Sequence, residues 1–405
     1  MTVIDAGGRF AYPEVMLKAG VGQSSRTDTS SAVEEAAREA MKALPEGNAD
    51  LALLYATADH AGALEQDLAA LHRITGTRNT VGCSGLGILT DRGEIEGESG
   101  VAVMALASDT VRARPFVRDA LKGNDAAAGQ DIASAVAPDH PSLTVLLADG
   151  YRSRPDAMLE GLARAGHSGA VVGAAASENG SHGKTYQFFE ERVTSNSVVG
   201  FALSGAFETV IDITQGCQPV GEPMLITKAH ENLIFEIDGR PAFEVFVEII
   251  GKPFQQDLRR ALAFVFVGLS PDRKQTEIEP GQYLVRNIIG LDAQRGIVAV
   301  AEPVEAGQPL VFTLRDGQRA REDLGQMLAR QAARLEGRTP RLGLYFNCCA
   351  RGSGLYGVPG IDTAYIRQAL GDVPVIGFFG NYELGPMAGA NHLLTYTGVL
   401  AVVTE

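Results

Sequence analysis

The 405-residue chain has no tryptophan and few cysteines, which are Cys83, Cys217, Cys348 and Cys349. Neighbouring cysteines such as Cys348 and Cys349 rarely form a disulfide with each other. The spacing of the four matches neither a zinc site nor a disulfide framework. The sequence therefore predicts free thiols in a reducing compartment, the cytoplasm.

Clusters of basic residues and long apolar segments are also missing. No run of Lys and Arg interrupts the net charge of −14, so the surface is expected to repel nucleic acid. The longest apolar stretches, such as residues 261–269, are much shorter than the roughly 20 residues of a membrane-spanning helix. Residues 1–17 lack the basic start and apolar block of a signal peptide. We expect neither a nucleic-acid partner nor a membrane association.

Glycine, in contrast, is abundant, with 47 residues, while apolar residues make up 45% of the chain and charged residues 21%. These proportions are ordinary for a soluble globular protein. One hydrophobic core stops growing at roughly 250–300 residues, so a chain of this length is expected to form two domains.

The N-terminal part of the chain shows an order of helix, strand, helix, strand and closing strand. Amphipathic patterns at 30–44 and 62–75 predict the helices, and the first has Ser residues at its start. Apolar runs at 50–60, 80–88 and 100–108 predict the strands. This order is the first copy of a repeat.

The same order returns in residues 127–205 and again in 321–405. In each copy an apolar strand enters a turn of small residues: "VGCSGLG" begins at Val81, "VGAAASE" at Val172 and "IGFFGNY" at Ile376. Self-similarity on this scale indicates three related α/β units. Chance similarity of ordinary strand–helix segments is the alternative.

Residues 222–317 separate the second and third units and are mostly β in character. Asp238 and Gly239 form a strong turn dipeptide, and residues 282–317 have the pattern of a hairpin with further strands. Residues 242–250 fit a strand or a helix, and residues 254–267 fit a helix.

The predicted fold class is therefore α/β, in the mixed α+β sense, with two domains built from the repeated units. Residues 1–215 form the first domain with two units. Residues 216–405 form the second domain with the β-rich segment and the third unit.

Several of these stretches carry a family resemblance. They are "GCSGLG" (82–87), "VVGAAA" (171–176), "ITKAHENLIFEIDGRPAFEVF" (226–246), "LVRNIIGLD" (284–292), "CARG" (349–352), "GFFGNYELGP" (377–386) and "HLLTYTG" (392–398). In this order they resemble the FIST family, whose members join a FIST N-terminal domain to a FIST C-terminal domain. The resemblance covers about residues 15–405 and implies a sensor of a small molecule, such as an amino acid or a related carboxylate.

The resemblance also implies a signalling output. The chain has no room for a kinase, cyclase or receptor module, so it would pass a conformational signal to a separate, unidentified signalling protein. Two other functions stay open: a Cys-dependent enzyme acting on a small carboxylate or amide, and a ligand-free adapter. We expect a binding protein rather than an enzyme.

Open α/β sheets bind ligands outside the carboxyl ends of their strands. Polar segments follow the predicted strands at 57–60, 83–87, 148–153, 175–180, 347–354 and 380–385. We expect several of these segments to meet at a shared rim.

Arg351 is the strongest single candidate for a ligand-binding residue, because it follows a predicted buried strand and precedes Gly352. A guanidinium can hold a carboxylate by two parallel hydrogen bonds, whereas the alternative role is a structural salt bridge to a neighbouring loop. Glu383 could receive an ammonium group, cap a helix or pair with Arg351. The predicted ligand-binding residues are Arg351, Glu383, Asn347, Gly352, Asn381, Cys83, Ser84 and Cys349.

Cys349 is also a weak candidate for a nucleophile, with His392 as the nearest histidine in the C-terminal region. No Cys/His catalytic pattern is recognisable, and a buried cysteine that packs as a small apolar residue is commoner. "GCSGLG" and "AGVGQSS" (19–25) look like phosphate loops, but they lack the Walker Lys and the G-x-G-x-x-G spacing. No residues have metal-ligand spacing, so we predict no cofactor and no metal.

Overall fold

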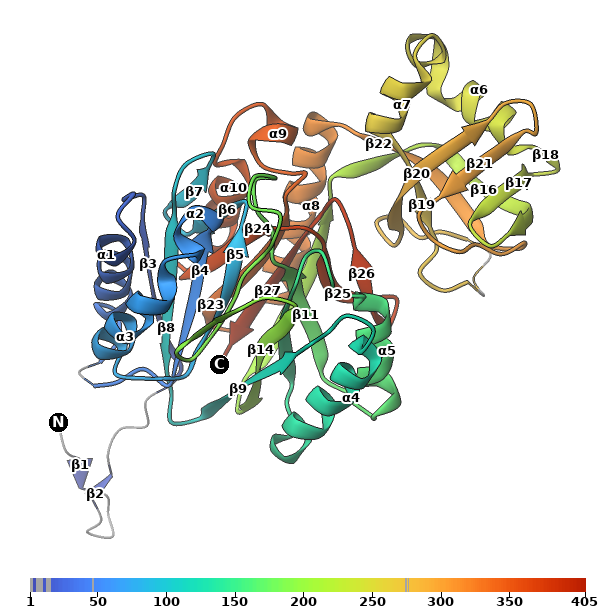
Figure 1. Ribbon diagram of the computed structural model, residues 1–405. Helices are drawn as coiled ribbons and strands as arrows, with labels where there is room; N and C mark the ends of the chain where they lie inside the picture. Colours follow the sequence, from blue (N-terminus) through green and yellow to red (C-terminus); the bar gives the residue numbers. More distant parts are fainter. Residues whose placement is uncertain (1–2, 5–9, 12–15, 46, 274, 276) are drawn as a thin grey trace.

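The computed structural model describes residues 3–4, 10–11, 16–45, 47–273, 275 and 277–405 (Figure 1). The fold is mixed α/β, as the sequence predicts. It contains the three predicted units and a separate β-rich part. A short pair of strands, β1 (Val3–Ile4) and β2 (Phe10–Ala11), precedes them. No helix among the described residues is both long and apolar enough to cross a membrane.

The three units share one order of elements. Unit 1 contains β3 (Lys18–Ser24), α1 (Thr29–Met41), β4 (Leu51–Thr57), α2 (Ala58–Ala61), α3 (Leu64–Thr75), β5 (Thr80–Gly85) and β8 (Val101–Ala107). Unit 2 contains β9 (Val111–Asp119), α4 (Asp125–Val136), η1 (Ala137–Asp139), β10 (Leu143–Ala148), α5 (Pro155–Arg164), β11 (Ala170–Ala175) and β14 (Ser197–Gly205). Unit 3 contains β15 (Glu208–Gln215), α8 (Gly317–Arg334), β23 (Pro340–Cys348), α9 (Ser353–Tyr356), α10 (Ile361–Leu370), β24 (Val375–Gly380) and β27 (Thr397–Thr404).

The strands of each unit pair in the same way. The strand after the unit's first helix (β4, β10 or β23) is parallel to the strand that enters the turn (β5, β11 or β24). It is antiparallel to the closing strand (β8, β14 or β27). The closing strand pairs in turn with an edge strand, β3, β9 or β15. The identical strand order confirms that the three segments are repeats.

A hairpin follows the turn in every unit, and it joins the sheet of another unit. The hairpins are β6 (Gly87–Thr90) with β7 (Gly93–Glu96), β12 (Gln187–Phe189) with β13 (Arg192–Thr194), and β25 (Glu383–Met387) with β26 (Ala390–Leu394). The unit 1 hairpin pairs with β24, the unit 2 hairpin with β5, and the unit 3 hairpin with β11. This cyclic exchange ties the three units into one body.

The inner faces of the three sheets pack on a common core, while helices cover the outer faces (Figure 1). The same hydrophobic cluster contains one fully or almost fully buried residue from each of β4, β10 and β23, namely Leu53, Val145 and Leu344. The rings of Tyr55 and Phe378 lie 4.7 Å apart across units 1 and 3. Burial of this apolar surface is the main force that holds the units together.

The segment "AGVGQSS", which resembles a phosphate loop, is largely the edge strand β3. A Cβ atom on Gly20 would lie 1.9 Å from the Ala40 carbonyl oxygen, and one on Gly22 would lie 2.2 Å from that of Ala36. These glycines therefore allow α1 to pack directly on β3.

The segment between β15 and α8, within unit 3, forms a barrel, which stands at one end of the molecule (Figure 1, yellow to orange). Its elements are β16 (Cys217–His230), β17 (Leu233–Ile237), β18 (Arg240–Pro241), α6 (Ala242–Gln255), α7 (Leu258–Phe264), β19 (Val265–Leu269), β20 (Leu284–Asp292), β21 (Ile297–Val300) and β22 (Pro309–Arg315). Strand β16 pairs with both β22 and β17, so the ring of strands closes.

Two sequence-based expectations for the barrel are now resolved. Residues 242–250 are helical, as part of α6. The helix predicted over residues 254–267 is wrong at its C-terminal end, because Val265 begins strand β19. Valine and phenylalanine in "VFV" favour a strand, and the pairing of β19 with β20 and β22 takes precedence over the helical pattern before it.

The predicted domain boundary at 215/216 falls between β15 and β16. Strand β15 pairs with β27, so residues from the predicted first domain complete the sheet of unit 3. The division into two domains stays a prediction.

Candidate functional site

The carboxyl ends of the parallel strands form three equivalent positions. The paired ends are Thr57 with Gly85 in unit 1, Ala148 with Ala175 in unit 2, and Cys348 with Gly380 in unit 3. The polar segments that the sequence predicts to form a rim follow these ends. Hairpin exchange brings neighbouring units together at each position.

Ser177 of unit 2 forms hydrogen bonds with residues of units 1 and 3 and so connects all three units. Its backbone carbonyl oxygen accepts a hydrogen bond from Ser84 Oγ at 3.0 Å, and its hydroxyl accepts one from the Leu86 N–H at 2.7 Å. The Ser177 hydroxyl donates a short hydrogen bond to the Phe379 carbonyl oxygen. Ser84 is fully buried here, so the structure places this predicted ligand-binding residue in the junction between units.

At the unit 2 position, side chains of units 2 and 3 form hydrogen bonds near the strand ends. The Asn381 side-chain amide donates to the Gly150 carbonyl oxygen at 3.0 Å. The Tyr151 hydroxyl donates a short hydrogen bond to the Glu178 carboxylate. Asn381, a predicted site residue, thus holds the loop after β10.

At the unit 3 position, Glu96 from the unit 1 hairpin occupies the space. Its carboxylate accepts hydrogen bonds from the Ser353 N–H at 3.0 and 3.1 Å and from the Ser353 hydroxyl at 2.9 Å. A Cβ atom on Gly352 would lie 2.4 Å from Glu96 Oε2, so the glycine is needed for this close approach. Gly352 therefore serves a contact between units in this structure.

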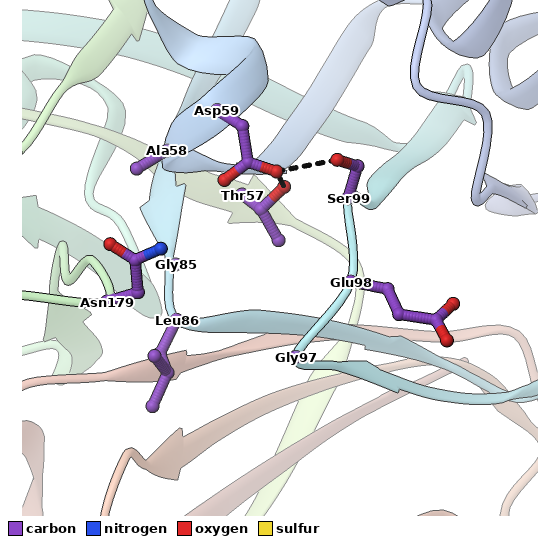
Figure 2. A pocket seen from close by; sticks show the side chains of 9 residues that line it. All are labelled: Thr57, Ala58, Asp59, Gly85, Leu86, Gly97, Glu98, Ser99 and Asn179. Carbon is purple, nitrogen blue, oxygen red and sulfur yellow. Dashed lines mark hydrogen bonds between the residues drawn. The ribbon is translucent and has the colours of Figure 1, made fainter. Parts of the chain in front are cut away.

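A pocket of about 360 Å³ lies at the unit 1 position (Figure 2). It is lined by Thr57, Ala58, Asp59, Gly85, Leu86, Gly97, Glu98, Ser99 and Asn179. Three of the predicted strand-end segments, 57–60, 83–87 and 175–180, meet at this pocket.

Asp59 is the charged group held most firmly in the pocket wall. Its carboxylate accepts a hydrogen bond from Ser99 Oγ at 2.6 Å and one from Thr57 Oγ1 at 3.3 Å. Burial raises the pKa of Asp59, but hydrogen bonds, with that from Ser99 the strongest, lower it by more, so its net pKa is below the ordinary value. Asp59 is thus ionised at neutral pH. Figure 2 shows Asn179, from unit 2, on the other side of the pocket.

Arg351 is not among the residues that line this pocket. Its side chain is 0% exposed, and Nη2 lies 2.7 Å from Asp362 Oδ1 and 2.5 Å from the Tyr356 hydroxyl. Asp362 Oδ2 also accepts a hydrogen bond from the Asn347 side chain at 3.0 Å. The structure thus brings Arg351 and Asn347 together around Asp362 in a buried network.

The charge of Arg351 is balanced inside this network. Burial lowers the pKa of Arg351, but Asp362 together with Tyr356 and Tyr345 raises it by more, so the guanidinium stays charged. This pair is the structural salt bridge that the sequence left open as the alternative. Ligand contact by Arg351 and Asn347 stays a prediction.

Glu383 is also buried, and it does not pair with Arg351. Its Oε2 accepts hydrogen bonds from the Thr397 hydroxyl at 2.7 Å and from the Thr397 N–H at 3.3 Å. Within the described residues its Oε1 has no partner. Burial raises the pKa of Glu383 well above its ordinary value and so favours the protonated, neutral form. That form lacks the charge that would attract an ammonium group.

Cys349 is half-buried, and the other three cysteines are buried. Its thiol lies 4.0 Å from Asn381 Oδ1. Contact with the Cys348 thiol is the largest cause that lowers the pKa of Cys349, with burial opposing it. Burial raises the pKa of Cys83, which is fully enclosed in unit 1.

His392, the histidine considered as a partner of Cys349, lines a different hollow. That hollow has a volume of about 510 Å³, and Asp156 and His167 also line it. The groups that the structure gives as neighbours of the Cys349 thiol are Cys348, Asn381, Glu383, Arg315, Tyr151 and Tyr396. No histidine is among these described neighbours, so they supply no base for a Cys/His pair.

Sequence reasoning missed two groups of residues. Gly97, Glu98 and Ser99 line the pocket because they follow an exchanged hairpin, and no local pattern announces that exchange. Asp362, in the first turn of α10, is not among the predicted site residues. Its position 11 residues after Arg351 carries no motif. Among the described residues, no group of three or more His, Cys, Asp or Glu side chains is arranged to hold a metal ion.

Fold and site define an α/β protein of three interlocked units and a barrel, with a polar hollow at the strand ends of one unit. The chain belongs to the FIST family. The FIST N domain matches residues 50–240, and the FIST C domain matches residues 242–386.

Relatives with the same extent are known in mycobacteria. An uncharacterized protein of Mycobacterium tuberculosis is 33% identical over 96% of this chain and 100% of its own length. An uncharacterized protein of Mycobacterium bovis is 31% identical over 96% of this chain and 99% of its own length.

Two solved cyanuric acid hydrolases overlap only loosely with the chain. One, from A. caulinodans, has a TM-score of 0.35 at 11% identity and covers 96% of this chain and 99% of its own. The other has a TM-score of 0.34 at 13% identity and covers 96% and 100%. Overlap at this level establishes neither a shared fold nor a shared activity.

Proposed function

We propose that this chain is a sensory protein that binds a small polar molecule in the unit 1 pocket. The observation that carries the proposal is the pocket of about 360 Å³ at the strand ends of unit 1. Polar segments of units 1 and 2 meet there, at the carboxyl ends of the parallel strands β4 and β5.

The lining favours a ligand with a protonated amine, such as an amino acid. Asp59 and Glu98 are the charged residues among the nine that line the pocket, and both are acidic. An ionised carboxylate attracts an ammonium group, and two such groups disfavour a ligand that is an anion overall. Thr57, Ser99 and Asn179 add hydroxyl and amide groups for a ligand's polar atoms.

Signal transfer to a separate partner protein is part of the proposal. The pocket combines residues of units 1 and 2, and residues 97–99 continue the hairpin that pairs with unit 3. A ligand that contacts these parts would favour the arrangement of units that it binds better. A partner that reads this arrangement would receive the signal.

A thermal-shift screen against amino acids, simple amines and simple carboxylates tests the proposal. A ligand with a dissociation constant of ~10 μM, present at ~1 mM, stabilises the folded state by ~2.7 kcal/mol. We expect amino acids or amines to raise the melting temperature and simple carboxylates to leave it unchanged. If no compound shifts it, the ligand-free adapter is the better description.

The variant Asp59→Asn locates the site. It keeps the shape of the side chain but removes the charge, so we expect affinity for the hit from the screen to fall by ten- to a hundredfold, or about 1.4–2.8 kcal/mol. Glu65→Gln is the matched control, because Glu65 is exposed on α3 and is not among the lining residues. Titration calorimetry with unchanged affinity for Asp59→Asn would place the ligand elsewhere.

A Cys-dependent enzyme is the second candidate, because the half-buried Cys349 has a lowered thiol pKa. Its test is turnover of small amides and esters by the wild type and by Cys349→Ser. Turnover that the substitution abolishes would favour the enzyme over the sensor.

A further inference from the structure

The hydrogen-bonding groups of the unit 1 pocket are divided unevenly between donors and acceptors. The hydroxyl hydrogen of Ser99 is donated to Asp59 Oδ2. The hydroxyl hydrogen of Thr57 is directed to Asp59 Oδ2 at 3.3 Å or to the Gly100 carbonyl oxygen at 3.5 Å. A hydroxyl group has one hydrogen and two lone pairs, so these two side chains keep only acceptor capacity for a ligand.

The two acidic side chains of the pocket add further acceptors. An ionised carboxylate accepts hydrogen bonds and donates none. Both hydroxyl groups bind Oδ2 of Asp59, so its Oδ1 accepts from neither of them. Glu98 is exposed and lies on the segment opposite Asn179 (Figure 2). A ligand in this pocket must therefore supply hydrogen-bond donors of its own.

Asn179 has the one side-chain donor that is left among the nine lining residues. Its Oδ1 accepts hydrogen bonds from the Ser181 N–H at 3.1 Å and from the Ser181 hydroxyl at 2.5 Å. Because a backbone N–H can pair only with the amide oxygen, this contact fixes the orientation of the side chain. Figure 2 shows the amide nitrogen on the side of the pocket. This neutral donor can bind a carbonyl or hydroxyl oxygen, but it cannot balance the charge of a carboxylate.

Basic side chains beside the lining residues do not change this balance. His60 follows Asp59 and is buried, and burial is the largest cause that lowers its pKa, which favours the neutral imidazole at pH 7. Lys184, in the loop after Asn179, lies over the Tyr186 ring at 4.8 Å from its centre and is not among the lining residues. The negative charge of the lining thus has no cation beside it in the pocket.

We propose that the unit 1 pocket selects a cationic amine whose second polar group is a neutral acceptor, such as an amino-acid amide, over the free amino acid. The inference rests on the proposed function and narrows its ligand class. The ammonium group binds the Asp59 carboxylate by a charge-assisted hydrogen bond, and Asn179 donates to the carbonyl oxygen. The carboxylate of a free amino acid instead meets two charges of its own sign and one neutral donor, so its charge opposes binding.

Matched pairs of ligands test the proposal on the full chain. Titration calorimetry at pH 6.5 compares alanine, leucine and lysine, each as the free amino acid and as the carboxamide. The amine is protonated in both forms at this pH, since α-amino groups titrate at about 7.7–8.0. The members of a pair differ chiefly in the charge of the second group. We expect the carboxamide that binds best to bind tighter than its free amino acid by roughly tenfold or more.

The outcomes separate this inference from the proposed function. A free amino acid that binds as tightly as its carboxamide would overturn the inference. The proposed function would then stand, because a ligand with a protonated amine still binds. If none of the six compounds binds, both are overturned.

Glu98→Gln tests whether the charge of the pocket sets the preference. It removes a carboxylate and keeps an acceptor oxygen, so the preference for the carboxamide over the free amino acid should fall by roughly three- to tenfold. Glu65→Gln is the matched control, because Glu65 is exposed on α3 and does not line the pocket. It should keep the wild-type preference. An unchanged preference in Glu98→Gln would overturn the proposal.

Asn179→Ala tests the neutral half of the ligand. The best carboxamide is compared with the amine that lacks the carboxamide group, which is ethylamine, 3-methylbutylamine or 1,5-diaminopentane. The substitution should weaken binding of the carboxamide by roughly three- to tenfold and change that of the amine by less than about twofold. Asn179 and Glu98 are both exposed, and the melting temperature of each ligand-free variant checks that it folds as the wild type does. An equal loss for the carboxamide and the amine would overturn the assignment of Asn179 to the neutral acceptor.

Discussion

The strand ends of units 1 and 3 hold equivalent places in the repeat, yet their charged side chains differ in surroundings. In unit 1, Asp59 faces a pocket and its hydrogen bonds come from neighbouring hydroxyls. In unit 3, Arg351 turns inward to Asp362, and Glu96 binds Ser353 beside it. The comparison teaches that the same backbone frame carries a buried ion pair at one position and a pocket at another.

The neighbouring units contribute different side chains to the two positions. At the unit 3 position the exchanged hairpin brings Glu96, whose carboxylate reaches the backbone of the loop after β23. At the unit 1 position the chain between β11 and β12 brings Asn179, which lines the pocket. The surroundings of equivalent strand ends therefore depend on residues from other units.

Removing Asp362 should have the largest effect on stability. Asp362→Leu leaves Arg351 as a fully buried charge without its carboxylate, and breaking a buried pair in this way costs about 3–5 kcal/mol. Urea denaturation measures the free energy of unfolding. Asp59→Asn, at the equivalent open position, should change it by less than about 1 kcal/mol.

A double variant is the control for this prediction. Arg351→Met combined with Asp362→Leu removes both charges, so much of the lost stability should return. If Arg351 instead binds a ligand, Arg351→Met should have the same free energy of unfolding as the wild type and should lose only ligand affinity. That result would mean that the charged residues at both strand-end positions serve binding rather than stability.

The repeat could be read from the sequence because its signals are local. An apolar strand that ends in small residues predicts the same strand and turn in every copy, as in "VGCSGLG" from Val81 and "IGFFGNY" from Ile376. The exchange of hairpins could not be read, because β6 pairs with β24 across almost the whole chain. Residues 87–90 have the pattern of a strand in either arrangement, so the partner is decided by tertiary packing.

The candidate site was predictable to a similar degree. The rule that ligands bind at the carboxyl ends of strands selected Thr57, Gly85 and Asn179 within three short segments. The same rule selected Arg351, whose side chain is buried. A sequence does not reveal whether a side chain at a strand end points inward or outward. Asp362 supplies the buried partner through a loop whose path depends on Gly352 and Glu96.

Substitution of Ser177 should have the next largest effect, because this residue links units 1 and 3. Ser177→Ala removes the hydroxyl that accepts from the Leu86 N–H and donates to the Phe379 carbonyl, while these two backbone groups keep their own hydrogen bond of 3.1 Å. We expect a loss of about 1–1.5 kcal/mol in urea denaturation, the size of a lost hydrogen bond. Ser181→Ala, at an exposed serine of the same loop, should change stability by less than about 0.5 kcal/mol. Equal effects of the two substitutions would show that the units do not depend on this junction.

Thiol labelling compares the same two units by chemistry rather than by stability, and it should disturb the protein least. Cys349 of unit 3 is half-buried with a lowered pKa, whereas Cys83 of unit 1 is fully enclosed and burial raises its pKa. Because the thiolate is the reactive form, iodoacetamide should modify Cys349 first in the native protein, at a rate that stays appreciable below pH 9. Mass spectrometry of the labelled peptides identifies the site, and Cys349→Ser should abolish the fast phase while Cys83→Ser leaves it unchanged. Fast labelling of Cys83 would instead mean that unit 1 opens as far as its core strand β5. The pocket would then belong to a unit that opens in solution rather than to a rigid one.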